Sequence, residues 1–153
     1  MIYILMIVGI LFLDQLTKWL IVANLGLGES IPLIGFFKLT YVQNTGAAFS
    51  LFSNGTLFLI ILTMVFLGVM VYLWHKPFMK TYKFSVAIII GGALGNFIDR
   101  ILHGYVVDFF NFTYFPVFNI ADIALCCGVG LLALQIIFDK EGKTNDNNGK
   151  NKN

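Results

Sequence analysis

Charged residues are scarce in this chain of 153 residues, at 12% of the total, and the formal net charge is only +2. A charge this small and dispersed gives no support for a nucleic-acid partner. Hydrophobic residues make up 58% of the sequence and the mean hydropathy is +0.84, far from the averages of a soluble domain. The sequence therefore predicts one domain whose apolar surface is covered by membrane lipid.

Residues that bind metals or serve as nucleophiles are also few. Cys126 and Cys127 are adjacent in an apolar segment, and together with His75 and His103 they show no ligand spacing. We interpret the cysteines as packing residues and expect no metal and no other cofactor. The four serines, at positions 30, 50, 53 and 85, lack a GxSxG setting and have no histidine near them in the sequence.

Four apolar segments are long enough to cross a hydrocarbon core of about 30 Å. They cover residues 1–23, 55–74, 84–101 and 118–138. The first lacks the basic start and the small-x-small site of a cleaved signal peptide, so we expect it to remain as a helix. Residues 139–153 are polar and rich in asparagine, which predicts a disordered tail after a single domain of residues 1–138.

Small residues and turn residues refine this picture. Gly91 and Gly95 form a GxxxG pair, which we interpret as helix packing within one molecule rather than as a dimer contact, and we expect a monomer. Glycine and proline interrupt the helical pattern after residue 24, and the run FFKLTYV alternates as a strand does. A small β region is predicted at about 30–52, with a turn signal at residues 44–46.

Lysines predict the orientation. Residues 75–83 contain three and the tail contains four, whereas the loop of residues 24–53 contains one and the loop of residues 102–117 none. Cytoplasmic loops carry the excess of basic residues, so both termini are predicted to be cytoplasmic. The acidic residues of the membrane body then gather toward the outer face.

Three aspartates lie in the otherwise apolar stretch of residues 91–122. Asn96 and Asp99 are three positions apart, as are Asn119 and Asp122, so each amide shares a helix face with an acid if both segments are helical. Asp108 lies in the apolar run VVDFF. Buried carboxylates are costly unless they are paired, hydrogen-bonded or protonated. One polar site near the outer face accounts for all of them.

Two acids of the membrane body, Asp14 and Asp99, have a cation close by in the sequence. Asp14 and Lys18 are spaced for an ion pair within a helix, which either locks that helix to its neighbours or belongs to the site. Asp99 precedes Arg100, and we interpret this as an ion pair at the end of the third helix.

The sequence alone leaves open which two of Asp99, Asp108 and Asp122 act together. Asp108 and Asp122 have no adjacent cation and are better placed to share a proton, which would allow water to hydrolyse an amide. The alternative is a small proton or ion carrier with a relay of Asp14, Asp99 and Asp122. The inner halves of the helices have almost no ionisable groups, which disfavours a relay.

The chain resembles lipoprotein signal peptidases, the signal peptidase II family. Five motifs carry the resemblance: DQLTK at 14–18, NTGAAFS at 44–50, GGALGNFIDR at 91–100, VVDF at 106–109 and FNIAD at 118–122. The resemblance implies an all-α membrane protein of the bacterial inner membrane, with four transmembrane helices and a small extracytoplasmic β-cradle. It further implies an aspartic endopeptidase that cleaves a prolipoprotein signal peptide just before a cysteine carrying a diacylglyceryl group.

By the same resemblance, Asp108 and Asp122 are the catalytic pair. The supporting or substrate-binding residues that it implies are Asp14, Lys18, Asn44, Gly46, Asn96, Asp99, Arg100 and Asn119. We expect Asn96 and Asn119 to bind the acids or the substrate backbone, and Asn44 to hold the substrate from the aqueous side. The phenylalanines at 109, 110, 112, 115 and 118 either line a groove for an acyl chain or form an interfacial belt. The segment between Asp108 and Asp122 is shorter than in some relatives, which leaves the shape of the substrate entrance open.

Overall fold

The computed structural model describes residues 1–46 and 55–150. These residues form four long helices and three short strands. The elements in order are α1 (Ile2–Asn24), β1 (Ser30–Ile34), β2 (Phe37–Asn44), α2 (Gly55–Trp74), the short 3-10 helix η2 (Pro77–Thr81), α3 (Lys83–His103), β3 (Val106–Phe112) and α4 (Ile120–Lys150). Each long helix contains a stretch that is long and apolar enough to cross a membrane. The predicted architecture of four spans and a small sheet is confirmed.

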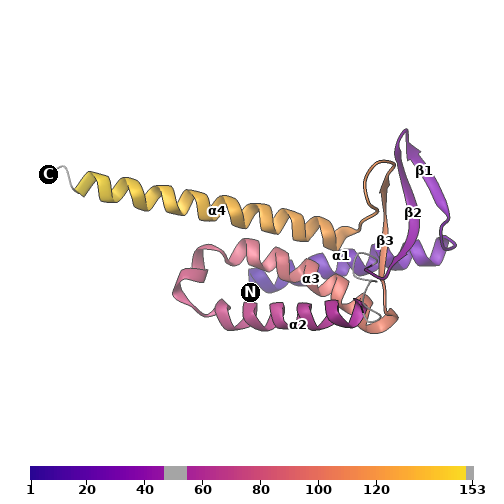
Figure 1. The fold of residues 1–153 in the computed structure, drawn as a ribbon, viewed down its shortest axis with the longest axis horizontal. Coiled ribbons are helices and arrows are strands. Elements are labelled where there is room, and N and C mark those ends of the chain that lie inside the picture. The colour runs from indigo at the N-terminus through magenta and orange to yellow at the C-terminus, as the bar shows by residue number, and fades with distance from the viewer. Residues whose placement is uncertain (47–54, 151–153) are drawn as a thin grey trace.

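Helix α3 is the central element, since it packs against α1, α2 and α4 (Figure 1). Its small residues permit these contacts. A Cβ atom added at Gly91 would lie 3.1 Å from the Ile10 side chain of α1, and one added at Gly92 would lie 2.5 Å from the backbone oxygen of Ala121 in α4. The predicted use of the GxxxG segment for packing within the molecule is confirmed.

The three strands form an antiparallel sheet in the order β1-β2-β3. This sheet stands at one end of the helices, opposite the connection between α2 and α3 (Figure 1). Its buried residues Tyr41, Val107 and Phe109 pack against Ile21 and Leu25 at the end of α1. The sheet therefore has a fixed position on the helical body.

Strand β3 corrects one prediction, because residues 102–117 were expected to be a loop. Helix α3 ends at His103 and is capped by Gly104, whose positive φ of 79° suits glycine, and the chain then returns along β2. Val107 and Asp108 lie opposite Gln43 and Val42 of β2. The loop prediction was wrong because it overlooked an apolar, partly β-branched run with a strand partner elsewhere in the chain.

Helix α4 also differs from its prediction. It begins at Ile120 instead of 118, since Phe118 forms an isolated β-bridge with Phe110. It continues to Lys150, and the disorder predicted for residues 139–153 stays a prediction. Its apolar span ends at Asp139, close to the predicted 138. Residues 47–52 of the predicted β region, which include most of the NTGAAFS motif, lie outside the described residues.

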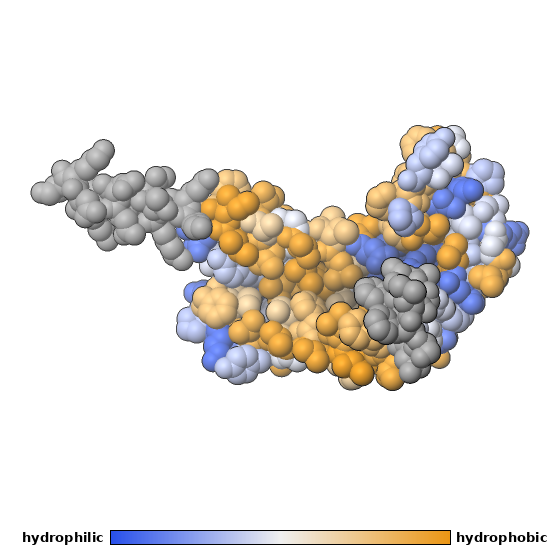
Figure 2. All heavy atoms as spheres, in the orientation of Figure 1, coloured by the Kyte–Doolittle hydropathy of each residue, from blue (hydrophilic) through white to orange (hydrophobic). Residues whose placement is uncertain are grey.

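Apolar side chains dominate the visible surface of the helices, as expected for a lipid-facing body (Figure 2). Hydrophilic residues gather on this face where the helices meet the sheet (Figure 2). The predicted cytoplasmic position of both termini stays a prediction.

Candidate active site

Asp108 lies on β3 with 2% of its surface exposed. Its Oδ1 accepts a hydrogen bond from Asn119 Nδ2 at 2.7 Å, and its Oδ2 accepts one from Asn44 Nδ2 at 2.8 Å. Burial raises the pKa of Asp108 to about 6; the hydrogen bond from Asn44 opposes this rise, and the nearby charge of Asp122 adds to it. A carboxyl with this pKa can carry a proton near neutral pH.

Asp122 lies in the first turn of α4 and forms a capping box with Asn119. The backbone N–H of Asp122 donates to Asn119 Oδ1 at 2.9 Å, and the backbone N–H of Asn119 donates to Asp122 Oδ2 at 3.1 Å. The other oxygen, Oδ1, accepts from Asn96 Nδ2 at 2.8 Å. The spacing that predicted a shared helix face is therefore explained by a helix cap.

Asn119 connects the two acids. Its side chain donates to Asp108 and its backbone donates to Asp122, so both carboxylates are hydrogen-bonded to the same residue. Asn119 Nδ2 also lies 3.0 Å from Asn96 Oδ1. The expected hydrogen bonds from Asn96 and Asn119 to the acids are present, and they bring Asp108 and Asp122 together.

Behind this pair, Lys18 forms a buried ion cluster with Asp14 and Asp99. Its Nζ lies 2.8 Å from Asp14 Oδ2 and 3.0 Å from Asp99 Oδ2. The predicted pair of Asp14 and Lys18 is confirmed. The predicted pair of Asp99 and Arg100 is wrong, because consecutive helix residues point in different directions and Asp99 faces α1.

Asn44 is the last residue of β2, and Gly46 follows two positions later. The backbone N–H of Gly46 donates to Asn44 Oδ1 at 2.9 Å, which turns the amide nitrogen of Asn44 toward Asp108. Gly46 has a φ of 78°, and a Cβ there would lie 2.7 Å from Leu59. In this structure Asn44 holds a catalytic candidate, where the sequence suggested that it holds the substrate.

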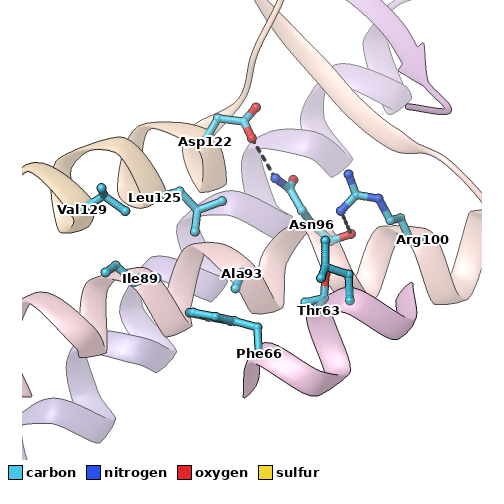
Figure 3. A pocket seen from close by; sticks show the side chains of 10 residues that line it. Thr63, Phe66, Ile89, Ala93, Asn96, Arg100, Asp122, Leu125 and Val129 are labelled. Carbon is cyan, nitrogen blue, oxygen red and sulfur yellow. Dashed lines mark hydrogen bonds between the residues drawn. The ribbon is translucent and has the colours of Figure 1, made fainter. Parts of the chain in front are cut away.

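Arg100 lies beside Asn96 and Asp122 at one end of a cavity of about 540 Å³ between α2, α3 and α4 (Figure 3). Its Nη1 donates to the Asn96 backbone oxygen at 3.5 Å. The remaining walls of the cavity are mostly apolar: Leu62, Thr63, Phe66, Ile89, Ala93, Leu125 and Val129. Arg100, Asn96 and Asp122 thus place a cation, an amide and a carboxyl group at one end of an apolar groove.

A second cavity, of about 280 Å³, also borders Asp122. It is lined by Phe115, Phe118, Ile123, Cys126 and Cys127. Two of the phenylalanines expected at a groove are therefore present there. A third, Phe109, belongs to the core beneath the sheet.

Some groups of the site had no recognised role in the sequence. Gln15 donates to Asp99 Oδ1 at 2.9 Å and to Asp14 Oδ2 at 3.2 Å, and only its position beside Asp14 could have indicated this. The backbone N–H groups of Val107 and Ala121 donate to Asp99 and Asp14. Backbone donors leave no signal in a sequence.

The described serines do not point to another nucleophile. Ser30 is hydrogen-bonded to Thr40 across the sheet, and Ser85 donates to Gln135 in the part of the helices away from the sheet. The serines at 50 and 53 lie outside the described residues. Within residues 1–46 and 55–150, no three His, Cys, Asp or Glu side chains are arranged to hold a metal ion.

The chain is similar to several known proteins. A family model described as signal peptidase (SPase) II matches residues 6–138. A lipoprotein signal peptidase of Halalkalibacterium halodurans is 45% identical over 97% of this chain and 99% of its own, and one of Bacillus pumilus is 46% identical over 83% and 86%. A bacterial membrane enzyme solved at 2.3 Å by the in meso method superposes with a TM-score of 0.83 and 36% identity, over 92% of this chain and 90% of that one.

Proposed function

The chain belongs to the signal peptidase II family, and we propose that it removes prolipoprotein signal peptides with an aspartic dyad formed by Asp108 and Asp122. The single observation that carries the dyad is the hydrogen bonding of both carboxylates to Asn119, at 2.7 Å and 3.1 Å. Two acids held together in this way can share one proton and act on one bond. The family does not favour the alternative of a proton or ion carrier.

In the proposed reaction, Asp108 begins protonated and Asp122 begins ionised. Asp122 takes a proton from a water molecule whose oxygen attacks the scissile carbonyl carbon, while Asp108 gives its proton to the carbonyl oxygen. In the second step the C–N bond breaks. Asp122 returns its proton to the leaving nitrogen, and a hydroxyl of the intermediate returns a proton to Asp108, which restores both groups.

The raised pKa of Asp108 supports this assignment of roles, because the protonated form of that acid is far more populated near neutral pH than it is in an ordinary aspartate. Arg100 and Asn96 lie beside Asp122 and carry N–H groups that suit the carbonyl oxygens of a substrate backbone. Arg100 and Asn96 can donate these hydrogen bonds without a metal ion. The proposed site therefore combines a proton donor, a proton acceptor and backbone-binding groups.

The two cavities suit a substrate that has two apolar parts. A prolipoprotein presents an apolar signal peptide on one side of the scissile bond and a lipid-modified cysteine on the other. Asp122 borders both cavities. We assign the larger one, between α2, α3 and α4, to the signal peptide and the smaller one, beside Phe115 and Phe118, to an acyl chain, so that the bond to be cut lies where they meet.

Conversion of either acid to its amide tests the dyad. Asp108→Asn and Asp122→Asn keep the size of the side chain but remove the exchangeable proton, so each should abolish cleavage of a diacylglyceryl-modified precursor by purified enzyme. Asp139→Asn is the matched control, since Asp139 accepts from Tyr82 at the far end of the apolar span of α4. Normal turnover by D108N or D122N would refute the dyad.

A further inference from the structure

The ammonium group of Lys18 contacts three acceptors behind the proposed dyad. Besides Asp14 and Asp99, it donates to Asn96 Oδ1 at 3.1 Å. An ammonium has three N–H donors, so each one has a partner here. Lys18 is 3% exposed and lines neither of the two cavities that border Asp122. Its ammonium group therefore lies outside the two cavities assigned to the substrate.

The two carboxylates bound to Lys18 each hold a backbone position next to one acid of the dyad. Asp14 Oδ1 accepts from the backbone N–H of Ala121 at 2.9 Å, and Ala121 directly precedes Asp122. Asp99 Oδ2 accepts from the backbone N–H of Val107 at 3.0 Å, and Val107 directly precedes Asp108. One cation thus connects the start of α4 to β3.

The third contact of Lys18, with Asn96, fixes the orientation of the Asn96 side-chain amide. Lysine can only donate, so the oxygen of Asn96 faces Lys18 and its nitrogen faces Asp122. If the amide turned over, its oxygen would face the carboxylate of Asp122 and its hydrogen bond would be lost.

We propose that Lys18 is the positioning residue of the dyad: it sets the placement of both acids through Asp14 and Asp99, and the orientation of Asn96, without touching the substrate. The inference rests on the proposed function of Asp108 and Asp122. It explains why a costly buried charge lies on α1, away from the reacting bond. It also predicts that Lys18 affects turnover rather than substrate binding.

Lys18→Met tests this by removing the charge while keeping the length of the side chain. A displacement of catalytic groups by about 1 Å can cost about 100-fold, so we expect kcat per folded enzyme to fall by about that factor, with KM within about threefold of the wild-type value. Thr17→Val is the control, because Thr17 adjoins Lys18 but its hydroxyl bonds only to the backbone of its own helix. It should retain both constants.

A second variant allows for the chance that two unpaired carboxylates prevent Lys18→Met from folding. The combination of Asp14→Asn, Lys18→Met and Asp99→Asn leaves no charge unpaired and keeps side-chain oxygens that can accept from Ala121 and Val107. Its kcat should lie between those of Lys18→Met and wild type, since Asn96 is still free to turn. Folding is measured by melting temperature and gel filtration in detergent.

A folded Lys18→Met or triple variant with the kcat of wild type would overturn the inference, as would a change confined to KM. Asp108→Asn and Asp122→Asn, assayed in parallel, separate the two proposals. If they are inactive while the folded Lys18 variants turn over normally, only the role of Lys18 fails. If they are active, the dyad itself fails.

Discussion

Asp108 is a carboxyl group in a place where water is scarce. Two amide nitrogens hydrogen-bond to it, yet burial still raises its pKa from 3.8 to about 6. The folded protein therefore keeps a proton that the unfolded chain releases between these two pH values. Because the unfolded state binds fewer protons there, the free energy of unfolding must fall as the pH rises from about 4 to about 6.

Asp108→Asn should remove this pH-dependent cost. A rise of about two pKa units corresponds to about 3 kcal/mol, so the variant should gain up to about that much relative to wild type between pH 4 and pH 8. Thermal melts of both proteins in detergent, recorded across this pH range, measure the difference. A melting-temperature difference that does not change with pH would contradict the predicted cost.

Most side chains of the site could be predicted from the sequence, because a polar residue in an apolar segment requires a partner. The identity of the partner could not be predicted in the same way. Asp99 has an arginine as its chain neighbour but pairs with Lys18, 81 positions earlier, because helix geometry turns adjacent side chains apart. The sequence thus predicted the members of the network better than its connections.

Among the elements, the four helices were predictable and β3 was not. Apolar runs of the right length define spans without reference to the rest of the chain. A strand depends on a partner, and β3 acquires its partner only when α3 returns the chain to β2. The start of α4 differs from β3 in this respect, because the local N-x-x-D pattern of Asn119 and Asp122 could have been recognised as a capping box.

Helix α3 offers a test of how closely packing controls the site. In Gly92→Ala the new methyl group would lie 2.5 Å from the Ala121 oxygen, so α4 must shift, and Asp122 with it. Such overpacking costs about 1–3 kcal/mol, and we expect a lower melting temperature together with a lower kcat. Purified enzyme in detergent allows both to be measured.

Gly68→Ala in α2 is the matched control for Gly92→Ala. A Cβ at Gly68 meets nothing within 4 Å, and alanine is favoured over glycine in a helix by about 1 kcal/mol. The control should keep full activity and melt at the same temperature or slightly higher. Equal behaviour of the two variants would show that the contact of α3 with α4 tolerates an added methyl group.

In the whole molecule, the site and the lysine-rich connection lie at opposite ends. Asp108 and Asp122 lie where the helices meet the sheet, whereas Lys76, Lys80 and Lys83 surround the turn between α2 and α3 (Figure 1). Lipid-modified precursors present their cysteine at the outer face of the membrane. A peptidase for them needs its site at that face, so we predict that the basic turn lies in the cytoplasm, which is also the orientation that the excess of lysines predicts.

Single cysteines at the two ends can test this orientation in a background that lacks Cys126 and Cys127. Ile34→Cys at the tip of the β1–β2 hairpin and Phe78→Cys in η2 replace side chains that are 79% and 58% exposed. A membrane-impermeant maleimide should label Ile34→Cys in intact cells and Phe78→Cys only after permeabilisation. The reverse pattern would place the dyad at the cytoplasmic face, where it could not reach a lipidated precursor, so the orientation and the proposed substrate stand or fall together.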